Sequence, residues 1–444
     1  MKNLNQPSRK GNMASSLRNL ESRLLACVVF CLGVSALPAA PRHVYLTWQG
    51  DTGRTITINY QTMGAAESST VYYDTKPRMG NLASYKHQAT GTGHQIEGLA
   101  DGRTIHWVEL SKLKPGNTYF FVAGDARNGF SAERKFQTIP DGHQKLRFVD
   151  GGDMGTGPAL QPLLRQAALS EPNFAVIGGD IAYAGDVLTN FGKWDDWIDA
   201  WENCMVTPKG FTIPMVAAIG NHEVRGGVGH STTNAVFYFQ YFAQVHDRSY
   251  YSRKFGKNFV IYLLDTGHLT PQGGTQAAWL DAEMEADLAF PHHFAVYHVP
   301  LYPTVRAFEG GGSVAGRDAW LPIFDKHHLT TAFEHHDHAF TRTKLLRNNQ
   351  VDPQGTLYLG DGCWGQGARA VGSVRKWYEA KSASLQHFWL VDVSRNRVEY
   401  RAVNKEGKIF DVYPSDSQGV AAAEEVFQSL TRSVPTQAAT PATK

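Results

Sequence analysis

Five short segments of this sequence place residues that commonly bind metal ions directly after apolar runs. The segments read GDMG, GDIAY, GNHE, VYHVP and EHHDH, and their candidate ligands are Asp153, Asp180, Tyr183, Asn221, His222, His298, His335, His336 and His338. An aspartate after a strand is usually a turn former or helix cap, and a lone histidine is rarely a ligand, so each segment alone is a weak signal. Together they supply carboxylates, a phenol, an amide and imidazoles, a mixture that a dinuclear metal site explains.

Tyr183 is the least expected of these donors. A free phenol loses its proton near pH 10, so a phenolate ligand at acidic pH requires a strongly Lewis-acidic ion. We interpret this ion as ferric iron. The imidazoles and the amide suit a divalent partner, and one carboxylate must bridge the two ions.

These segments can meet only if their strands lie side by side. The sequence predicts apolar strands that alternate with amphipathic helices, at residues 146–152, 174–180, 213–220, 259–265, 293–298, 329–334 and 356–362, with a hairpin at 388–403 that closes the sheet. In such α/β domains the carboxyl ends of adjacent strands meet at one crevice. We therefore expect all five segments at one rim.

The preceding part of the chain has a different rhythm. From about residue 42 to 138, short strand-like runs such as TITINY and TYFFVAG are separated by turns rich in Gly, Pro, Asn and Asp, which predicts an all-β sandwich. We see no chemistry in this part and interpret it as a structural module. The predicted fold class is therefore multidomain, all-β followed by α/β.

Composition excludes some functions and indicates export. The 444 residues carry 43 basic and 41 acidic side chains, and this balance favours neither nucleic acid nor an anionic membrane as partner. The first 40 residues resemble a signal peptide, with an uncleaved anchor as the alternative, so we expect a secreted or periplasmic protein without stable membrane insertion after signal removal. Cys204 and Cys363 then remain, and one disulfide between them is possible.

The ordered set of GDMG, GDIAY, GNHE, VYHVP and HHDH resembles the purple acid phosphatases of the calcineurin-like metallophosphoesterase superfamily. The resemblance covers about residues 42 to 412 and includes GGTQAAWLDAEM at 273–284 and HAFTRT at 338–343. After the predicted signal peptide at 1–40, it implies a fibronectin type III-like N-terminal domain at 41–140 and a four-layer α/β/β/α catalytic domain at 141–413. Residues 414–444 are predicted to be a disordered tail.

The resemblance also implies a ligand set. Fe3+ would be held by Asp153, Tyr183, His338 and the bridging Asp180. A divalent ion, Fe2+, Zn2+ or Mn2+, would take Asp180, Asn221, His298 and His336. Most relatives in the superfamily begin with Asp-x-His, whereas here Met154 and Gly155 follow Asp153 and Tyr183 replaces the missing histidine.

The chain departs from the family pattern near the last two histidines. Family members usually have Gly-His-x-His, but here His335 stands in place of the glycine, and the residues after VYHVP contain Arg306 and no histidine. The acid that protonates the leaving group is therefore unassigned among His335, His222 and Asp337. We expect His222, Asn221 and Arg306 to bind substrate phosphate.

The resulting hypothesis is an acid phosphatase that hydrolyses small phosphate monoesters with a metal-bound hydroxide and has an acidic pH optimum. The first alternative is a phosphodiesterase or phospholipase-like enzyme with the same metals. The second is a non-catalytic, metal-binding adhesion module. Two simpler expectations complete the set: Asp186, Glu223 and Asp265 are turn residues, and Trp194, Trp197 and Trp201 form the buried stripe of a helix.

Overall fold

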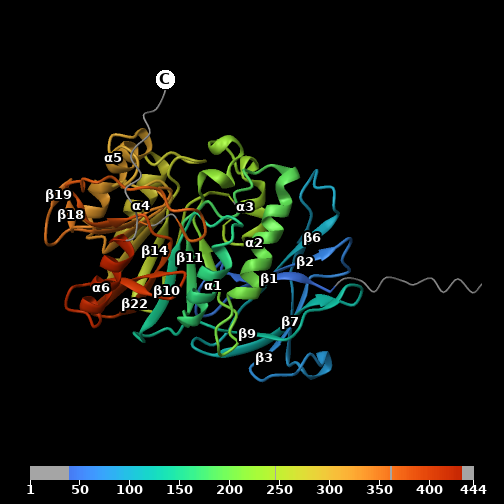
Figure 1. Ribbon diagram of the computed structural model, residues 1–444. Helices are drawn as coiled ribbons and strands as arrows, with labels where there is room; N and C mark the ends of the chain where they lie inside the picture. Colours follow the sequence, from blue (N-terminus) through green and yellow to red (C-terminus); the bar gives the residue numbers. More distant parts are fainter. Residues whose placement is uncertain (1–39, 246, 361–362, 433–444) are drawn as a thin grey trace, which may run out of the picture. The chain divides into compact units, whose positions relative to one another are not determined.

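The computed structural model describes residues 40–245, 247–360 and 363–432. These residues form an N-terminal β-domain followed by an α/β domain (Figure 1). The predicted signal peptide, on which the expected export depends, and the last residues of the predicted tail lie outside the described residues.

The β-domain consists of two antiparallel sheets. The first has the order β1-β2-β6-β5, formed by Arg42–Thr47, Ile56–Met63, Arg103–Leu110 and Thr92–His94. The second has the order β4-β3-β7-β8, with β9 also paired to β7, formed by His87–Thr90, Thr70–Asp74, Thr118–Asp125, Gly129–Phe130 and Arg134–Gln137. Leu46 and Ile58 from one sheet and Val71 and Phe121 from the other are buried in one core, as expected of a sandwich.

The α/β domain contains two larger sheets. One has the order β12-β11-β10-β22-β23-β24, formed by Met215–Ala217, Phe174–Ile177, Leu146–Gly151, His387–Ser394, Arg397–Asn404 and Ile409–Tyr413. The other has the order β13-β14-β15-β16-β20-β17-β21, formed by Tyr251–Phe255, Phe259–Leu263, His292–Tyr297, Thr331–Glu334, Leu357–Gly360, Phe340–Thr343 and Glu379–Ala383. We call these sheet I and sheet II.

The two sheets face each other across an aromatic core. Phe148 and Phe174 of sheet I contact Phe259 of sheet II, with ring centroids 5.8 and 6.3 Å apart, and Phe148 also contacts Phe294 and Phe333. Helices α1 (Leu160–Leu169) and α2 (Phe191–Cys204) bury their apolar side chains together with those of sheet I. Helices α4 (Thr275–Ala286) and α5 (Gly311–Lys326) do the same with sheet II. The predicted α/β/β/α layering is therefore confirmed.

Shorter elements complete the chain. They are α3 (Val236–Tyr241), the hairpin of β18 (Leu346–Arg347) and β19 (Gln350–Val351), and the 3-10 helices Leu82–Ser84, Leu188–Asn190, Asn221–Glu223, Arg225–Gly227 and Thr232–Asn234. On α2, Trp194, Trp197 and Trp201 are fully buried, as their spacing predicts.

The predicted disordered tail is wrong for part of its length, because helix α6 spans Val420–Arg432. Its buried Phe427 lies against Phe340 and Phe410, with ring centroids 6.0 and 6.5 Å away, and Lys381 lies over the Phe427 ring. Ala423 and Phe427 are the buried pair of an amphipathic stripe. Burial of this stripe against the domain stabilises a helix in a segment whose polar composition predicts disorder.

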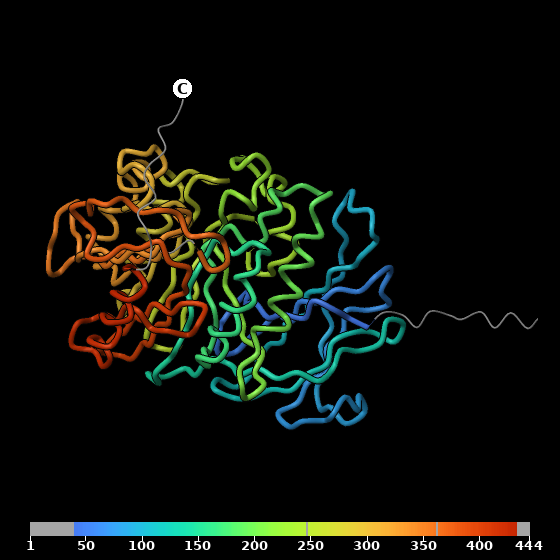
Figure 2. The backbone as a smooth tube through the Cα atoms, viewed as in Figure 1, coloured from blue at the N-terminus to red at the C-terminus, as the bar shows by residue number. Residues whose placement is uncertain are grey.

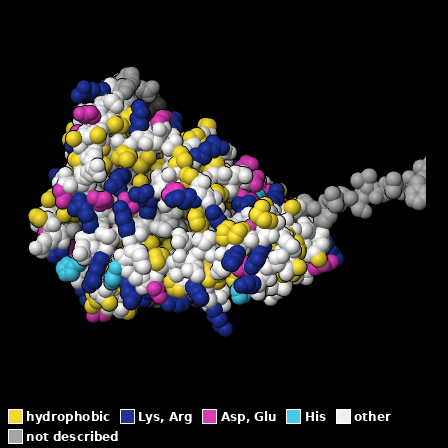
Figure 3. Space-filling model, turned by 90° about the horizontal axis from the view of Figure 1, so that it is seen from below, with side chains coloured by type: hydrophobic (Ala, Val, Ile, Leu, Met, Phe, Trp, Pro, Cys, Tyr) yellow, Lys and Arg dark blue, Asp and Glu magenta, His cyan; other side chains and the backbone are white. Residues whose placement is uncertain are grey.

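Figure 2 traces the backbone of the described residues, among which Cys204 and Cys363 are buried and form no disulfide. None of the helices in the described ranges is both long and apolar enough to cross a bilayer. The surface drawn in Figure 3 carries Lys and Arg side chains interspersed with acidic and apolar ones. This mixture fits the small net charge of +2.

Candidate metal centre

The candidate ligands lie at the carboxyl ends of five strands. Asp153 and Asp180 follow β10 and β11, and Asn221 begins the 3-10 helix after β12. These three strands are parallel neighbours in sheet I. His298 follows β15, and His336 and His338 follow β16, which are parallel neighbours in sheet II. The strand ends of both sheets therefore meet at one place, as the sequence predicts.

The first cluster consists of Asp153, Tyr183 and His338. The Tyr183 hydroxyl donates to Asp153 Oδ1 at 2.8 Å, and His338 Nε2 lies 2.8 Å from the same oxygen. Tyr183 Oη and His338 Nε2 are 3.0 Å apart. Three donor atoms from three segments thus converge on one point, with two ligands from sheet I and one from sheet II.

The second cluster consists of Asp180, Asn221, His298 and His336. His298 Nε2 lies 3.1 Å from Asp180 Oδ2, 3.1 Å from Asn221 Oδ1 and 3.0 Å from His336 Nδ1. Ligand atoms of Asp153, Asp180, His298 and His336 all lie within 4.8 Å of one another, so the two clusters adjoin. Sheet I and sheet II each contribute two residues to this cluster.

The backbone is strained at these positions. Asp153, Asp180, Tyr183, His336 and His338 have φ values of 51°, 52°, 57°, 68° and 52°. Residues other than glycine rarely adopt this left-handed conformation, and such strain is concentrated at functional sites. Gly220 is required here because a Cβ atom would lie 2.4 Å from Asp180 Oδ1.

Buried groups behind the clusters fix the ligands. One oxygen of Glu223 accepts the backbone N–H groups of Asp180 and Gly220 at 2.7 and 2.9 Å, and the other accepts that of Ile181 at 2.7 Å. His298 Nδ1 donates to the carbonyl of Gly178 at 3.0 Å, which turns Nε2 toward the cluster. Glu223 therefore serves as a turn acceptor, as expected from the sequence, but it connects two of the ligand-bearing loops.

The electrostatics of the clusters fit a pair of cations. Burial favours the neutral form of Asp153, but nearby His298 and His338 hold its pKa well below the ordinary value. Burial and the carboxylates of Asp153 and Asp180 raise the pKa of Tyr183 far above 10. Burial lowers the pKa of His336 to about 2, with a further contribution from His298, so its imidazole is neutral and has a lone pair for a metal. Because burial and these carboxylates oppose ionisation of the phenol, Tyr183 would need a highly charged cation beside it to act as a phenolate ligand.

His222 lies on the solvent side of the clusters. Its ring stacks on Tyr183 at a centroid distance of 4.1 Å, and its Nε2 is 3.8 Å from Asp180 Oδ2. Its side chain is 41% exposed, unlike those of the buried ligands His298 and His338. This position leaves the imidazole accessible to a molecule that approaches the clusters.

His335 lies in the interior, so the prediction that it contacts substrate or donates the proton is wrong. His335 is 1% exposed, and its backbone N–H donates to the His298 carbonyl at 3.0 Å. Its ring Nε2 lies 3.9 Å from the carboxylate of Asp150. A Cβ atom at Gly178 would lie 1.8 Å from the His335 ring. The imidazole thus occupies space that the glycines of the neighbouring strand ends leave open.

Arg306 and Asp337 form a pair at the edge of the second cluster. Arg306 Nη1 donates to Asp337 Oδ1 at 2.7 Å and to the carbonyl of His336 at 2.6 Å. Asp337 Oδ2 accepts the N–H of Val305 at 2.6 Å. Asp337 is only 5% exposed and is committed to these bonds, so it holds the segment around residue 305 and is no donor of protons to a leaving group.

Sequence reasoning missed Arg369. Its side-chain Nη1 donates to the carbonyl of His336 at 3.1 Å, and its backbone N–H donates to the carbonyl of His338 at 2.7 Å. The residue lies in an irregular segment between β20 and β21, where no periodicity or motif indicates which side chains reach the site.

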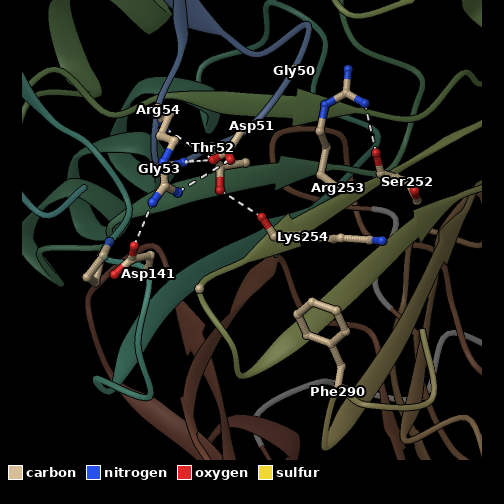
Figure 4. Close-up of a pocket in the computed structure, with 12 residues that line it drawn as sticks. Gly50, Asp51, Thr52, Gly53, Arg54, Asp141, Ser252, Arg253, Lys254 and Phe290 are labelled. Atoms are coloured by element: carbon tan, nitrogen blue, oxygen red, sulfur yellow. Dashed lines mark hydrogen bonds and ion pairs between the residues drawn. The ribbon is translucent and has the colours of Figure 1, made fainter. Parts of the chain in front are cut away.

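A separate cavity of about 380 Å3 lies between the β-domain and the α/β domain (Figure 4). Arg54 of the β-domain forms an ion pair with Asp141 there, at 2.8 Å, and Thr52 donates to the carbonyl of Lys254 at 2.7 Å. None of the candidate ligands lines this cavity. Its polar groups join the two domains.

Comparisons with known proteins agree with this architecture. The family model described as "Purple acid Phosphatase, N-terminal domain" matches residues 41–138, and "Calcineurin-like phosphoesterase" matches residues 139–340. Purple acid phosphatase 21 of Arabidopsis thaliana is 25% identical over 340 residues, which are 72% of this chain and 71% of the relative. Purple acid phosphatase 18 of the same plant is 23% identical over 88% of this chain and 84% of its own length.

A solved structure has the same fold. The purple acid phosphatase PPD1 from seeds of yellow lupin (Lupinus luteus) superposes with a TM-score of 0.73 at 19% identity, over 84% of this chain and 74% of the lupin chain. The two family models follow each other in the order of the two domains and together span more than half of the chain. This chain belongs to the purple acid phosphatase family.

Proposed function

We propose that this protein is an acid phosphatase that hydrolyses small phosphate monoesters at a dinuclear metal centre. A metal-dependent phosphatase activity follows from the family and the fold. The observation that carries the finer proposal is the convergence of seven donor side chains in two adjoining clusters, with Asp180 beside both. We further propose that the enzyme is secreted or periplasmic, because its first 40 residues resemble a signal peptide.

The two clusters divide the proposed ligands between the metals. Asp153, Tyr183 and His338 would hold Fe3+, Asn221, His298 and His336 would hold Fe2+, Zn2+ or Mn2+, and Asp180 would bridge them. When bound, the two cations neutralise phosphoryl oxygens and acidify the attacking water. The phenol supports the ferric assignment, since burial and two carboxylates oppose its ionisation.

The side chains around the clusters orient the substrate. The exposed imidazole of His222 faces the side from which a phosphate would approach, and the guanidinium of Arg306 lies beside the backbone of His336. His222 is our choice for the proton donor to the leaving group, because His335 and Asp337 are buried. Loss of this imidazole should reduce kcat more for substrates with poor leaving groups than for nitrophenyl esters.

The test compares the purified wild-type enzyme with Asp180→Asn. We expect the wild type to hydrolyse 4-nitrophenyl phosphate at acidic pH. The variant should lose more than about 100-fold of this activity, because a ligand shared by both metals should matter more than a residue that only orients a ligand. Asp196→Asn, on the exposed face of α2, is the matched control and should keep full activity. Full activity of Asp180→Asn would refute the dinuclear centre, and faster turnover of bis(4-nitrophenyl) phosphate at every pH would indicate a phosphodiesterase.

A further inference from the structure

Two arginines converge on one backbone atom beside the second cluster. Arg306 Nη1 and Arg369 Nη1 both donate to the carbonyl oxygen of His336, at 2.6 and 3.1 Å. Asp337 pairs with Arg306, but no carboxylate within the described ranges lies at ion-pair distance from Arg369. One guanidinium charge next to the metal ligands is thus left without a counter-ion from this part of the chain.

Arg369 is firmly positioned. The backbone N–H of Arg369 donates to the His338 carbonyl at 2.7 Å, and the backbone N–H of Gln366 donates to the Asp153 carbonyl at 3.0 Å. The segment that carries Arg369 is therefore bonded directly to two ligand-bearing loops. Pre-organised donors of this kind bind a ligand without a further cost in ordering.

The Arg306 loop is tied to the same region. Lys376 Nζ donates to the carbonyls of Pro303 and Arg306 at 2.6 and 2.5 Å. The two arginines therefore hold a fixed relation to each other, although Arg306 precedes and Arg369 follows His336 and His338 in the chain. Lys376 thus adds a third positively charged side chain to this region, bonded to the backbone of the Arg306 loop.

Guanidinium groups in this arrangement suit a phosphate. Each guanidinium has five N–H donors in a planar fork, and one of those on Arg369 is used by the His336 carbonyl. The phosphate that reacts must lie at the metal ligands. An anion at the arginines would be a second group of the same substrate molecule.

We propose that Arg306 and Arg369 form a second phosphate-binding subsite and that the enzyme selects substrates with a second phosphate group close to the one it removes. This inference rests on the proposed function, because it takes the metal centre as the place of the first phosphate. Arg369 is a specificity residue in this scheme, and the excess positive charge at the rim is its physical basis.

The test measures binding of two compounds that the enzyme cannot hydrolyse. Calorimetry of the metal-loaded protein should give tighter binding for methylenediphosphonate than for methylphosphonate. Arg369→Gln should weaken the diphosphonate about tenfold or more and the monophosphonate less than about threefold, since a charged hydrogen bond contributes at least that much. Arg375→Gln is the matched control, because Arg375 lies on the same segment, is exposed and donates to the Ala380 carbonyl, away from the metal ligands.

Three results would overturn the proposal. They are equal binding of both ligands by the wild type, equal weakening of both by Arg369→Gln, and loss of a metal ion from that variant, which would assign Arg369 to holding the His336 loop. Arg369→Lys should restore part of the diphosphonate affinity, because it returns the charge without the planar fork. An enzyme that discriminates between the ligands but hydrolyses no phosphate ester would refute the proposed function and keep the subsite.

Discussion

At the scale of single residues, the centre depends on side chains that the backbone holds in unfavourable conformations. Five of the seven proposed ligands have positive φ. Glu223 holds the loops of Asp180 and Gly220 together by accepting a hydrogen bond from the backbone N–H of each. The histidines and carboxylates shift one another's pKa values because they are buried side by side. Burial opposes the charged form of each of these groups, and a bound cation would offset that cost for the carboxylates, so the donor set suits metals.

Tyr183→Phe should remove the colour of the protein. The metal-loaded wild type should absorb in the visible region through the phenolate and the ferric ion, and the variant should lose this band because it has no oxygen to coordinate. Visible spectra and iron content of both proteins provide the measurement, with Tyr73→Phe in the β-domain as control. A colourless, active wild type with two zinc ions would refute the ferric assignment.

Glu223→Gln should reduce metal affinity and kcat by about 10- to 100-fold, the usual range for groups that orient ligands. The amide NH2 would replace one of the two carboxylate oxygens, so at least one backbone N–H that now donates to Glu223 would face another donor. Metal titration and steady-state kinetics measure both effects. Glu285→Gln, at an exposed site on α4, should leave them unchanged, and a Glu223→Gln enzyme with normal metal content would contradict this role.

At the scale of elements, the ends of strands position the proposed ligands, and a peripheral helix covers the edge of the hydrophobic core. Strands β10, β11 and β12 bring three ligand loops together in sheet I, and β15 and β16 bring two in sheet II. Helix α6 lies far along the chain from most of these loops but covers Phe340 and Phe410 at the edge of the core.

Phe427→Ala should lower the free energy of unfolding by about 3 kcal/mol, because it removes a buried aromatic ring from contact with Phe340 and Phe410. Thermal denaturation followed by circular dichroism would show a lower Tm. Gln428→Ala, on the exposed side of the same helix, should change Tm little. Equal Tm values for wild type and Phe427→Ala would mean that α6 does not pack as described.

Much of the site could be predicted because strand ends in a layered α/β domain meet at one rim. The apolar runs before Asp153, Asp180, Asn221 and His298 identify the strands, and the motifs identify the donors. The direction of the His335 side chain could not be predicted. It depends on the left-handed backbone conformation of His336 and on the absence of a side chain at Gly178, where a Cβ atom would collide with the His335 ring. Neither could Arg369, which reaches the site through hydrogen bonds between irregular segments.

At the scale of the whole molecule, the β-domain and the α/β domain share one hydrophobic core. Trp48 of the β-domain packs against Phe174 and Phe255 at centroid distances of 6.1 and 5.8 Å. Arg103 donates to Asp195 of α2, and Thr47 donates to the Ala243 carbonyl at 2.9 Å. We therefore expect residues 40–432 to unfold in one cooperative transition.

The stability of the wild type should fall as the pH is lowered from about 6.5 to about 4. His106 is fully buried between Thr62 and Ser69, and burial lowers its pKa from 6.5 to about 4. Above pH 6.5 it is neutral in both states, whereas below this value the unfolded chain binds a proton that the folded protein does not. His106 therefore contributes a loss on the order of 3 kcal/mol across this range.

His106→Gln should remove this contribution, so that its unfolding free energy falls less steeply between pH 6.5 and 4 than that of the wild type. Urea denaturation at several pH values measures the two slopes. His87→Gln, at an exposed position of the same domain, is the control and should follow the wild type. Parallel slopes for wild type and His106→Gln would show that His106 is not the titrating group.

Each metal cluster takes its ligands from both sheets, two from sheet I and one from sheet II in the first, and two from each in the second. A pair of ions bound at these ligands would therefore link the two sheets, because neither sheet alone supplies all the proposed ligands of either ion. Chelators should therefore extract the two metals together rather than one after the other, at a rate set by the separation of the sheets at this rim.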